Sequence, residues 1–362
     1  MDAFGRAVDG DGQLATKSEM TWEQRYHPLR DEWVVVAGHR QHRPWQGELQ
    51  GERVAALPSY VADCYLCPGN ARVHGAHNPA YESLFAFDND HPCVALDAPA
   101  PEPAASGESG VHVARRAQGV SRVVCYSPRH DLTLAQLSVS QIVELFQVWR
   151  AEYRALSALP TTEHVLVFEN KGEAVGVSNP HPHCQIYATN FVFKTIETEL
   201  TACQAHQART GRVLFRDIIA AEQNDGRRWL AETDSAVAFV PYFARYAYEA
   251  YVAPKRTYAN IAELPEAELP PLADALKQVL VRFDNLWQLE FPYVMALHQA
   301  PTRGAHPSFH FHIELHPPLR RPHLLKHLAG PEIGGGSFIS DTSPELTAAE
   351  LRALSLVHYK ER

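Results

Sequence analysis

Two histidines separated by one proline stand in the stretch 178–185, which reads SNPHPHCQ. The residues at its end and after it, QIYA, predict a strand. Side chains two apart on a strand share a face, so His181, His183 and Gln185 are expected to point the same way. Pro182 has no backbone donor, which is typical of a strand edge or of a departure from regular pairing. Imidazole can bind zinc, act as a general base or attack phosphorus. The stretch therefore predicts a chemical site, against the alternative of a surface strand with scattered histidines.

A second chemical pattern is the pair of cysteines Cys64 and Cys67. A closed tetrahedral zinc site needs four ligands, and no second C-x2-C pair exists among the six cysteines, so histidines are expected to complete it. His74 and His77 are close in sequence, and more distant candidates are His91, His130 and His181. A redox dithiol is the alternative, but the Pro-Gly that follows the pair leaves no helix to lower a thiol pKa. The pattern favours a metal site.

A third pattern lies in 309–316, FHFHIELH, where polar and apolar residues alternate strictly. His310 and His312 follow His181 and His183 at one common offset, and the Pro-Lys-Arg at 254–256 follows the Pro-Arg-His at 128–130 at nearly the same offset. Such self-similarity is the sign of an internal duplication. The sequence therefore predicts an α+β fold of two related halves, each with an antiparallel sheet and a long helix.

The elements that must position these residues follow the same order in both halves. Long helices are expected from about 134 to 159, with an apolar stripe, and from about 272 to 289. A shorter helix is expected around 197–207, and 97–110 reads as a flexible loop. Strands are expected near 31–38, 85–87, 120–126, 164–170, 185–188, 237–241, 251–253, 293–299 and 309–316.

Size and charge narrow the classes of function. The chain has 362 residues, 45% of them apolar, and a formal net charge of -9. Nucleic acids and anionic membranes need basic surface, so neither is expected as a partner, whereas a small phosphorylated ligand needs only a few cations. The basic loop 39–47, with Arg40 and Arg43, offers guanidinium forks for phosphate. No apolar run is long enough for a bilayer span, and the first twenty residues lack an apolar signal core, so a cytoplasmic location is expected.

Five motifs then carry a resemblance. They are, in chain order, RPWQG at 43–47, the Cys64–Cys67 pair, SPRH at 127–130, FENKG at 168–172 and HPHCQ at 181–185. Together they resemble the galactose-1-phosphate uridylyltransferase family of the histidine-triad superfamily, from about Trp22 to the C-terminus. The resemblance implies a disordered lead-in at 1–21, a catalytic half at 22–195 with the nucleophile and a zinc site, and a half at 196–362 with a second metal site and sugar-phosphate contacts.

The implied reaction is a two-step exchange. UDP-glucose gives its uridylyl group to a histidine and releases glucose 1-phosphate, and galactose 1-phosphate then takes the group. His183 matches the nucleophile, and a backbone carbonyl near the proline-rich turn is expected to fix its tautomer. Gln185 matches a donor to the transferring phosphate, and Ser178 and Asn170 match further contacts. The nucleotide-binding positions are Arg40, Arg43, Asn89 and Asp90, and the hexose-phosphate positions are Lys326 and Glu332.

The resemblance also implies two metal sites and a homodimer. His181 matches a zinc ligand together with Cys64, Cys67 and His130. The second site, for iron or zinc, matches Glu199 and His298 and one further pair, which is His310 and His312 by motif, or His312 and Glu314 when counted back from the prolines at 317–318. Cys184 replaces a frequent glycine. Phe338 replaces a glutamine that would contact the nucleotide across the dimer.

Two other readings remain. An ADP-glucose phosphorylase of the same superfamily would use the same nucleophile with another base and with phosphate as the acceptor. A non-catalytic, zinc-stabilised binding protein would form no covalent adduct.

Overall fold

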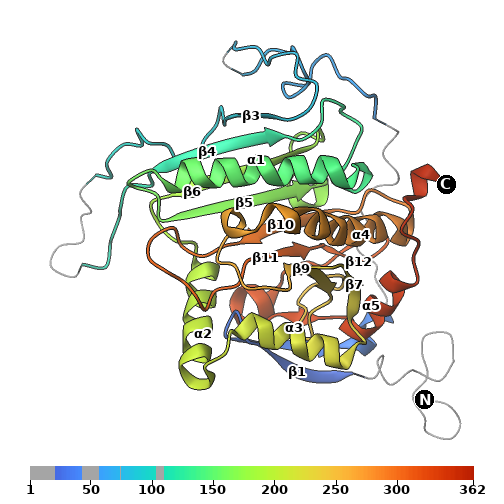
Figure 1. Cartoon of the computed structure of the whole chain (residues 1–362). Helices are drawn as coiled ribbons and strands as arrows, with labels where there is room; N and C mark the ends of the chain where they lie inside the picture. The colour runs from blue at the N-terminus through green and yellow to red at the C-terminus, as the bar shows by residue number, and fades with distance from the viewer. Residues whose placement is uncertain (1–20, 43–56, 74, 103–109) are drawn as a thin grey trace, which may run out of the picture.

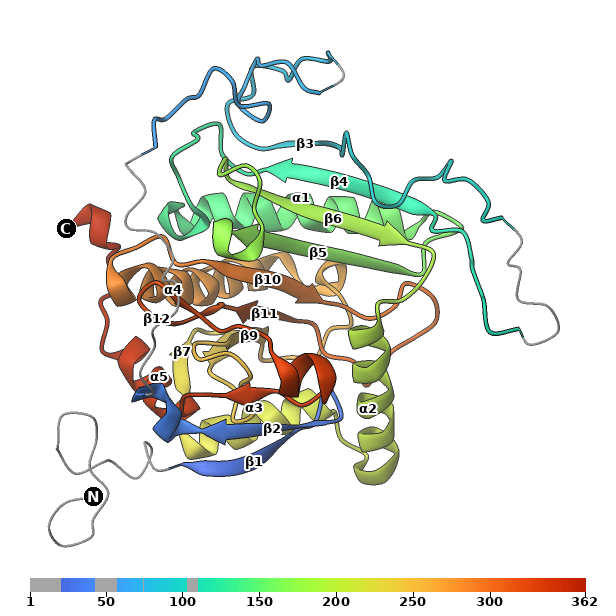
Figure 2. The ribbon, with the colours of Figure 1, turned by 180° about the vertical axis from the view of Figure 1, so that it is seen from behind.

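The structure is a computed structural model, and it describes residues 21–42, 57–73, 75–102 and 110–362. Arg43, His74 and the lead-in at 1–20 therefore lie outside the described residues. One antiparallel sheet of nine strands crosses the described part of the chain in the order β3-β4-β6-β5-β10-β11-β9-β8-β7 (Figures 1 and 2). Its strands are β3 (Phe85–Asp88), β4 (Gly119–Cys125), β5 (His164–Lys171), β6 (His183–Thr189), β7 (Trp229–Glu232), β8 (Ala236–Phe239), β9 (Ala250–Pro254), β10 (Tyr293–His298) and β11 (His312–His316).

The strand order is symmetric about its centre. The run β3-β4-β6-β5 of the first half is matched by β8-β9-β11-β10 of the second, and β5 pairs antiparallel with β10 where the halves meet. The predicted α+β fold of two related halves is thus confirmed, and the two half-sheets join into one. The boundary expected between residues 195 and 196 falls inside α2 (Lys194–Thr210).

Two long helices cover one face of this sheet, α1 (Val139–Ser157) and α4 (Leu269–Trp287) (Figure 1). Helix α1 begins after a capping box in which the Ser138 hydroxyl accepts from the Gln141 amide and Gln141 Oε1 accepts from the Ser138 amide. A separate 3-10 turn therefore occupies 134–136, where the sequence predicted helix. Strand residues of alternate position, such as Cys184 and Ile186, pack against the helices in the main core.

The opposite face is covered differently in the two halves. Helices α2 and α3 (Leu214–Asp225) pack beneath β8 and β9 in a second cluster that includes Phe215, Phe239 and Tyr251. A small sheet of β1 (Trp22–His27), β2 (Glu32–Ala37) and β14 (Ile339–Ser340) lies nearby, with α5 (Pro344–Arg352) and the hairpin β12 (Leu319–Arg321) and β13 (Leu324–Leu325). In the first half, the same face carries half-buried side chains, His183 and Gln185 among them.

Short turns complete the fold. The 3-10 segments are Gly38–His42, Leu134–Gln136, Glu173–Val175, Ile261–Glu263, Glu266–Glu268 and Tyr359–Glu361, and a π-helical turn spans Gly330–Gly334. Residues 97–102 and 110 have neither helix nor strand, as expected for that loop. Within the described ranges, no helix is both long enough and apolar enough to pass through a bilayer.

Candidate active site and metal clusters

His183 opens β6, where its backbone pairs with Cys125 of β4. Its ring nitrogen Nδ1 lies 2.7 Å from the carbonyl oxygen of His181. A carbonyl only accepts, so Nδ1 carries the proton and Nε2 keeps its lone pair. Burial lowers the pKa of His183, which keeps the ring neutral near pH 7. The arrangement presents an unprotonated imidazole nitrogen, and the carbonyl comes from the proline-rich turn as the sequence predicted.

The neighbours of His183 come from two adjacent strands and one loop. Gln185 lies two residues further along β6 and pairs with Phe168 of β5, which brings Asn170 to the level of His183. Ser178 is exposed in the loop before β6. Beneath the strand, Trp149 donates its indole N–H to the Cys184 sulfur at 3.2 Å. The frequent glycine is thus replaced by a thiol that packs into the core, away from the nucleophile.

The residues expected to bind the nucleotide separate into two places. Asn89 follows β3, where its amide donates to the Ser121 carbonyl of β4 at 2.8 Å, and Asp90 pairs with Arg72 at 3.5 Å. Both belong to the first half, near the nucleophile strand. Arg40 instead forms an ion pair with Asp341 at 2.9 Å, just after β14.

The expected hexose-phosphate residues also lie by β14. Lys326 Nζ contacts Glu332 Oε1 at 2.6 Å, and the same oxygen accepts from the Ile339 amide at 3.3 Å. The Phe338 ring lies 5.4 Å from Lys326 Nζ. Arg40, Lys326 and Glu332 therefore gather around β14, which pairs with β2 in the small sheet, whereas β6 lies in the nine-stranded sheet.

The sheet register gives the distance from His183 to the strand that precedes the hairpin of Lys326. Asn170 pairs with Val294, and Val294 pairs with His316, so His183 and His316 stand three strands apart in one row. At roughly 4.8 Å per strand, the row spans about 14 Å. The Lys326 amide is bonded to the Pro318 carbonyl, beyond His316. Lys326 and Glu332 contact each other and β14, and among the described residues no contact joins either of them to His183.

The first metal cluster consists of Cys64, Cys67, His130 and His181, which are all buried and whose donor atoms lie within 4.8 Å of one another. Cys67 Sγ is 3.6 Å from His130 Nδ1 and 3.5 Å from His181 Nδ1. Tetrahedral zinc with ordinary bond lengths separates sulfur and nitrogen ligands by about 3.6 Å. The cluster fits a tetrahedral metal of that size.

The surroundings of this cluster also suit a cation. His181 Nε2 lies 3.0 Å from the Ser127 carbonyl, so it carries the proton and leaves Nδ1 free to coordinate. Asn179 Nδ2 donates to Cys64 Sγ at 3.4 Å. Burial raises the pKa of the Cys67 thiol to about 11, so a cation must displace a proton to bind there. The nearby His77 instead contacts the Gly69 carbonyl, at 3.1 Å, and stays outside the cluster.

A second candidate metal cluster lies in the second half, where residues far apart in the sequence come together. Glu199 of α2, His298 of β10 and His312 of β11 are buried, with donor atoms within 4.8 Å of one another. Glu314 lies at the other ring nitrogen of His298, because its Oε2 is 3.2 Å from Nε2 whereas Glu199 Oε2 is 2.7 Å from Nδ1, and it forms a separate candidate group with His298 and His316. His310 does not join, since its Nε2 donates to the Pro254 carbonyl at 2.9 Å. Of the residues that the sequence left open, His312 joins Glu199 and His298, whereas Glu314 belongs to the neighbouring group.

The charge of this second cluster is partly balanced within the chain. Burial disfavours the charged form of His298, but the Glu314 and Glu199 carboxylates outweigh burial and raise the pKa of His298 to about 9. Arg30 Nη2 also contacts Glu314 Oε2 at 2.8 Å. Arg30 was not among the predicted site residues, because its local sequence gives no sign of a partner in β11. The carboxylate and imidazole donors could hold a metal ion.

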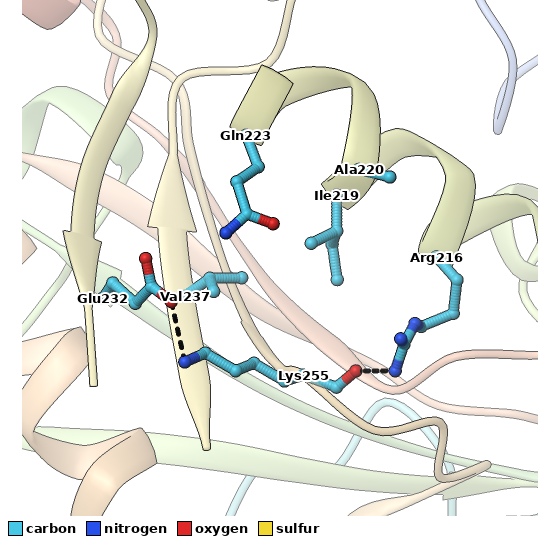
Figure 3. A pocket seen from close by; sticks show the side chains of 7 residues that line it. All are labelled: Arg216, Ile219, Ala220, Gln223, Glu232, Val237 and Lys255. Carbon is cyan, nitrogen blue, oxygen red and sulfur yellow. Dashed lines mark hydrogen bonds and ion pairs between the residues drawn. The ribbon is translucent and has the colours of Figure 1, made fainter. Parts of the chain in front are cut away.

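A small cavity of about 150 Å³ lies apart from these sites, between α3 and the strands β7 and β8 (Figure 3). Arg216 donates to the Lys255 carbonyl and Lys255 Nζ contacts Glu232 at 2.8 Å, so its cations already have partners. None of the predicted site residues lines it.

Comparison with known proteins shows the family of the chain. Residues 12–192 match the family described as galactose-1-phosphate uridyl transferase, N-terminal domain, and residues 199–362 match its C-terminal domain. The chain is 38% identical to galactose-1-phosphate uridylyltransferase of Haemophilus influenzae, over 94% of this chain and 96% of that protein. It is 34% identical to that of Rattus norvegicus, over 98% and 93%.

The chain is also similar to solved structures of uridylyltransferases. A uridylyltransferase structure aligns with a TM-score of 0.74 at 29% identity, covering 91% of this chain and 97% of the other. An ADP-glucose phosphorylase from Arabidopsis thaliana has the same TM-score at 21% identity, which shows the shared fold. Fold and relatives together define a nucleotidyltransferase built of two related α+β halves. The chain belongs to the galactose-1-phosphate uridylyltransferase family.

Proposed function

We propose that the enzyme carries the uridylyl group from UDP-glucose to galactose 1-phosphate through a covalent bond to His183. The observation that carries this proposal is the orientation of the His183 ring, whose Nδ1 donates to the His181 carbonyl at an N–O distance of 2.7 Å, while the described residues give Nε2 no partner. Neutral imidazole is a good nucleophile near pH 7, and its phosphoryl adduct is reactive enough to pass the group on.

The uridylyl transfer takes two steps. Nε2 of His183 attacks the phosphorus next to the uridine, the bond to the bridging oxygen breaks, and glucose 1-phosphate leaves with that oxygen. The ring then carries a positive charge, which the Nδ1–H bond to the His181 carbonyl stabilises. A phosphate oxygen of galactose 1-phosphate next attacks the same phosphorus, the P–N bond breaks, and His183 returns to its neutral form.

The residues around His183 are assigned by position. The Gln185 amide donates to the transferring phosphate, because it lies two residues along the same strand face. Asn170 at the level of His183 and Ser178 in the preceding loop supply further polar contacts. Asn89 and Asp90, next to β4, bind the nucleotide. This assignment rests on the register of β4, β6 and β5.

We assign zinc to the cluster of Cys64, Cys67, His130 and His181, because its sulfur–nitrogen distances match tetrahedral zinc. Zinc would supply a structural cross-link there, tying the loop from Cys64 to the residues just before β6. The cluster of Glu199, His298 and His312 is the candidate for a second metal, iron or zinc, with Glu314 beside it at 3.2 Å from His298. No catalytic step depends on either ion.

A homodimer is also part of the proposal. Arg40, Lys326 and Glu332 bind phosphate and sugar in family-like positions, yet among the described residues none of them contacts the same chain's His183. A second copy would bring them to it. The described cysteines are all unpaired thiols, which suits a reducing compartment such as the cytoplasm.

A substrate comparison tests the proposed reaction. The purified protein is given UDP-glucose with galactose 1-phosphate, and separately ADP-glucose with inorganic phosphate. We expect UDP-galactose and glucose 1-phosphate from the first mixture at a far higher rate than any product from the second. Faster turnover of ADP-glucose with phosphate would contradict the proposal and favour a phosphorylase.

A further inference from the structure

One hydroxyl beside the nucleophile has no role in the reaction described so far. Tyr187 lies two residues after Gln185 on β6, so the two side chains stand on the face that carries His183. The Tyr187 hydroxyl donates to Gln185 Oε1 at 3.1 Å. The Tyr187 ring packs edge-on against Phe168 of β5, with ring centroids 4.9 Å apart at 80°. Backbone pairing and ring packing together fix the hydroxyl next to the amide.

The two ends of a glutamine amide have opposite effects on a phosphate. Its N–H groups attract the phosphate oxygens, and its carbonyl oxygen repels them. With Oε1 turned to Tyr187, Nε2 occupies the other end of the amide. Within residues 21–42, 57–73, 75–102 and 110–362, we find no acceptor bonded to Gln185 Nε2. The amide donors are thus left for a ligand.

We propose that Tyr187 is a positioning residue that holds the Gln185 amide with its N–H groups toward the phosphate transferred by His183. The inference rests on the proposed uridylyl transfer. Without the hydroxyl, the amide would rotate by half a turn at little cost and would often present oxygen to an anion. Tyr187 therefore acts on the rate of transfer through Gln185 and touches no reacting atom.

The chemistry of the hydroxyl supports a constant donor role. Burial raises the pKa of Tyr187 to about 12, so the phenol keeps its proton over the pH range in which the imidazole nucleophile works. Cys93 lies close enough to Tyr187 to add to this effect. The hydrogen bond to Gln185 thus persists in both steps of the exchange.

A double-mutant cycle on the full-length enzyme tests the inference. The variants are Tyr187→Phe, Gln185→Ala and the two combined. Tyr242→Phe serves as a matched control, because Tyr242 packs beside Arg25 in the β1 region. Rates of UDP-galactose formation are measured at varied UDP-glucose. Removing one hydrogen bond of ordinary strength predicts a fall in kcat of about threefold to tenfold for Tyr187→Phe, with little change in KM.

The cycle separates positioning from a merely structural role. In the Gln185→Ala background, we expect Tyr187→Phe to have no further effect, because the amide it orients is gone. An equal loss in both backgrounds, or no loss in the native background, would overturn the role of Tyr187 and leave the transfer reaction standing. A native enzyme that forms no uridylyl adduct would overturn the proposed function and this inference with it.

Discussion

At the scale of single residues, the two histidines of the HPH motif differ in which nitrogen is held by a carbonyl. His181 donates from Nε2 to Ser127 and turns Nδ1 toward Cys67, whereas His183 donates from Nδ1 to His181 and keeps Nε2 free. The two histidines thus present different ring nitrogens, Nδ1 of His181 toward the metal cluster and Nε2 of His183 toward the proposed substrate. The sequence predicted that both would point the same way from one strand, but β6 begins only at His183, and the choice of nitrogen depends on carbonyls placed by tertiary structure.

One buried acid beneath the site predicts a pH effect on stability. Glu169 accepts hydrogen bonds from the hydroxyls of Tyr126 and Tyr293, and burial raises its pKa to about 7. A raised pKa means that the folded state holds the proton more tightly, so the stabilisation is present at low pH and is lost as pH rises from about 4.5 through 7. Glu169→Gln mimics the protonated acid and removes this dependence.

Urea unfolding at pH 5.5 and at pH 8 measures the effect. We expect the variant to gain stability relative to the native enzyme at pH 8, by at most about 3 kcal/mol. The comparison of native and variant at each pH cancels other titrating groups. An unchanged difference between the two proteins at both pH values would contradict the raised pKa.

At the scale of elements, the start of β6 is held from outside the sheet. The loop that carries Cys64 and Cys67 reaches His181 just before the strand, and Tyr126 pairs with the Pro182 carbonyl. The alternation in 309–316 predicted a longer strand, but β11 begins at His312 and His310 bonds to the Pro254 carbonyl. Alternation marks a face without marking where pairing starts, so it could not decide the ligand pair.

Loss of the cross-link should loosen this element. For Cys64→Ala we expect loss of most bound zinc and a clear fall in the melting temperature, because structural zinc contributes to folding directly. Metal released into a colorimetric chelator and thermal unfolding are measured together. Cys93→Ala is the matched control, since Cys93 is exposed and outside the cluster. Full zinc content in Cys64→Ala would contradict the assignment of this ligand.

At the scale of the whole molecule, the duplication produced one sheet with unequal halves. The first half carries His183, and the second carries the carboxylate-rich cluster and the residues around β14. Periodicity predicted both halves and their helices. It could not predict that β5 and β10 pair, because strand partners far apart in sequence are chosen by packing. Nor could it show that Lys326 and Glu332 bond to each other and to β14.

A mixing experiment tests whether the second copy completes the site. His183→Ala and Lys326→Ala are each expected to be nearly inactive. In a mixed dimer, one site would combine the intact His183 of one chain with the intact Lys326 of its partner. After subunit exchange, an equal mixture should regain about a quarter of native activity. Formation of mixed dimers, checked by native mass spectrometry, without recovered activity would contradict the shared site.

The central claim is that His183 becomes uridylylated. Intact mass spectrometry after brief incubation with UDP-glucose alone measures this directly. We expect a gain of one uridylyl group per chain, located on the peptide that contains His183. This group should be lost when galactose 1-phosphate is added, and it should not form in His183→Ala. An unmodified native chain under conditions where UDP-galactose forms, or an adduct that persists in His183→Ala, would contradict it.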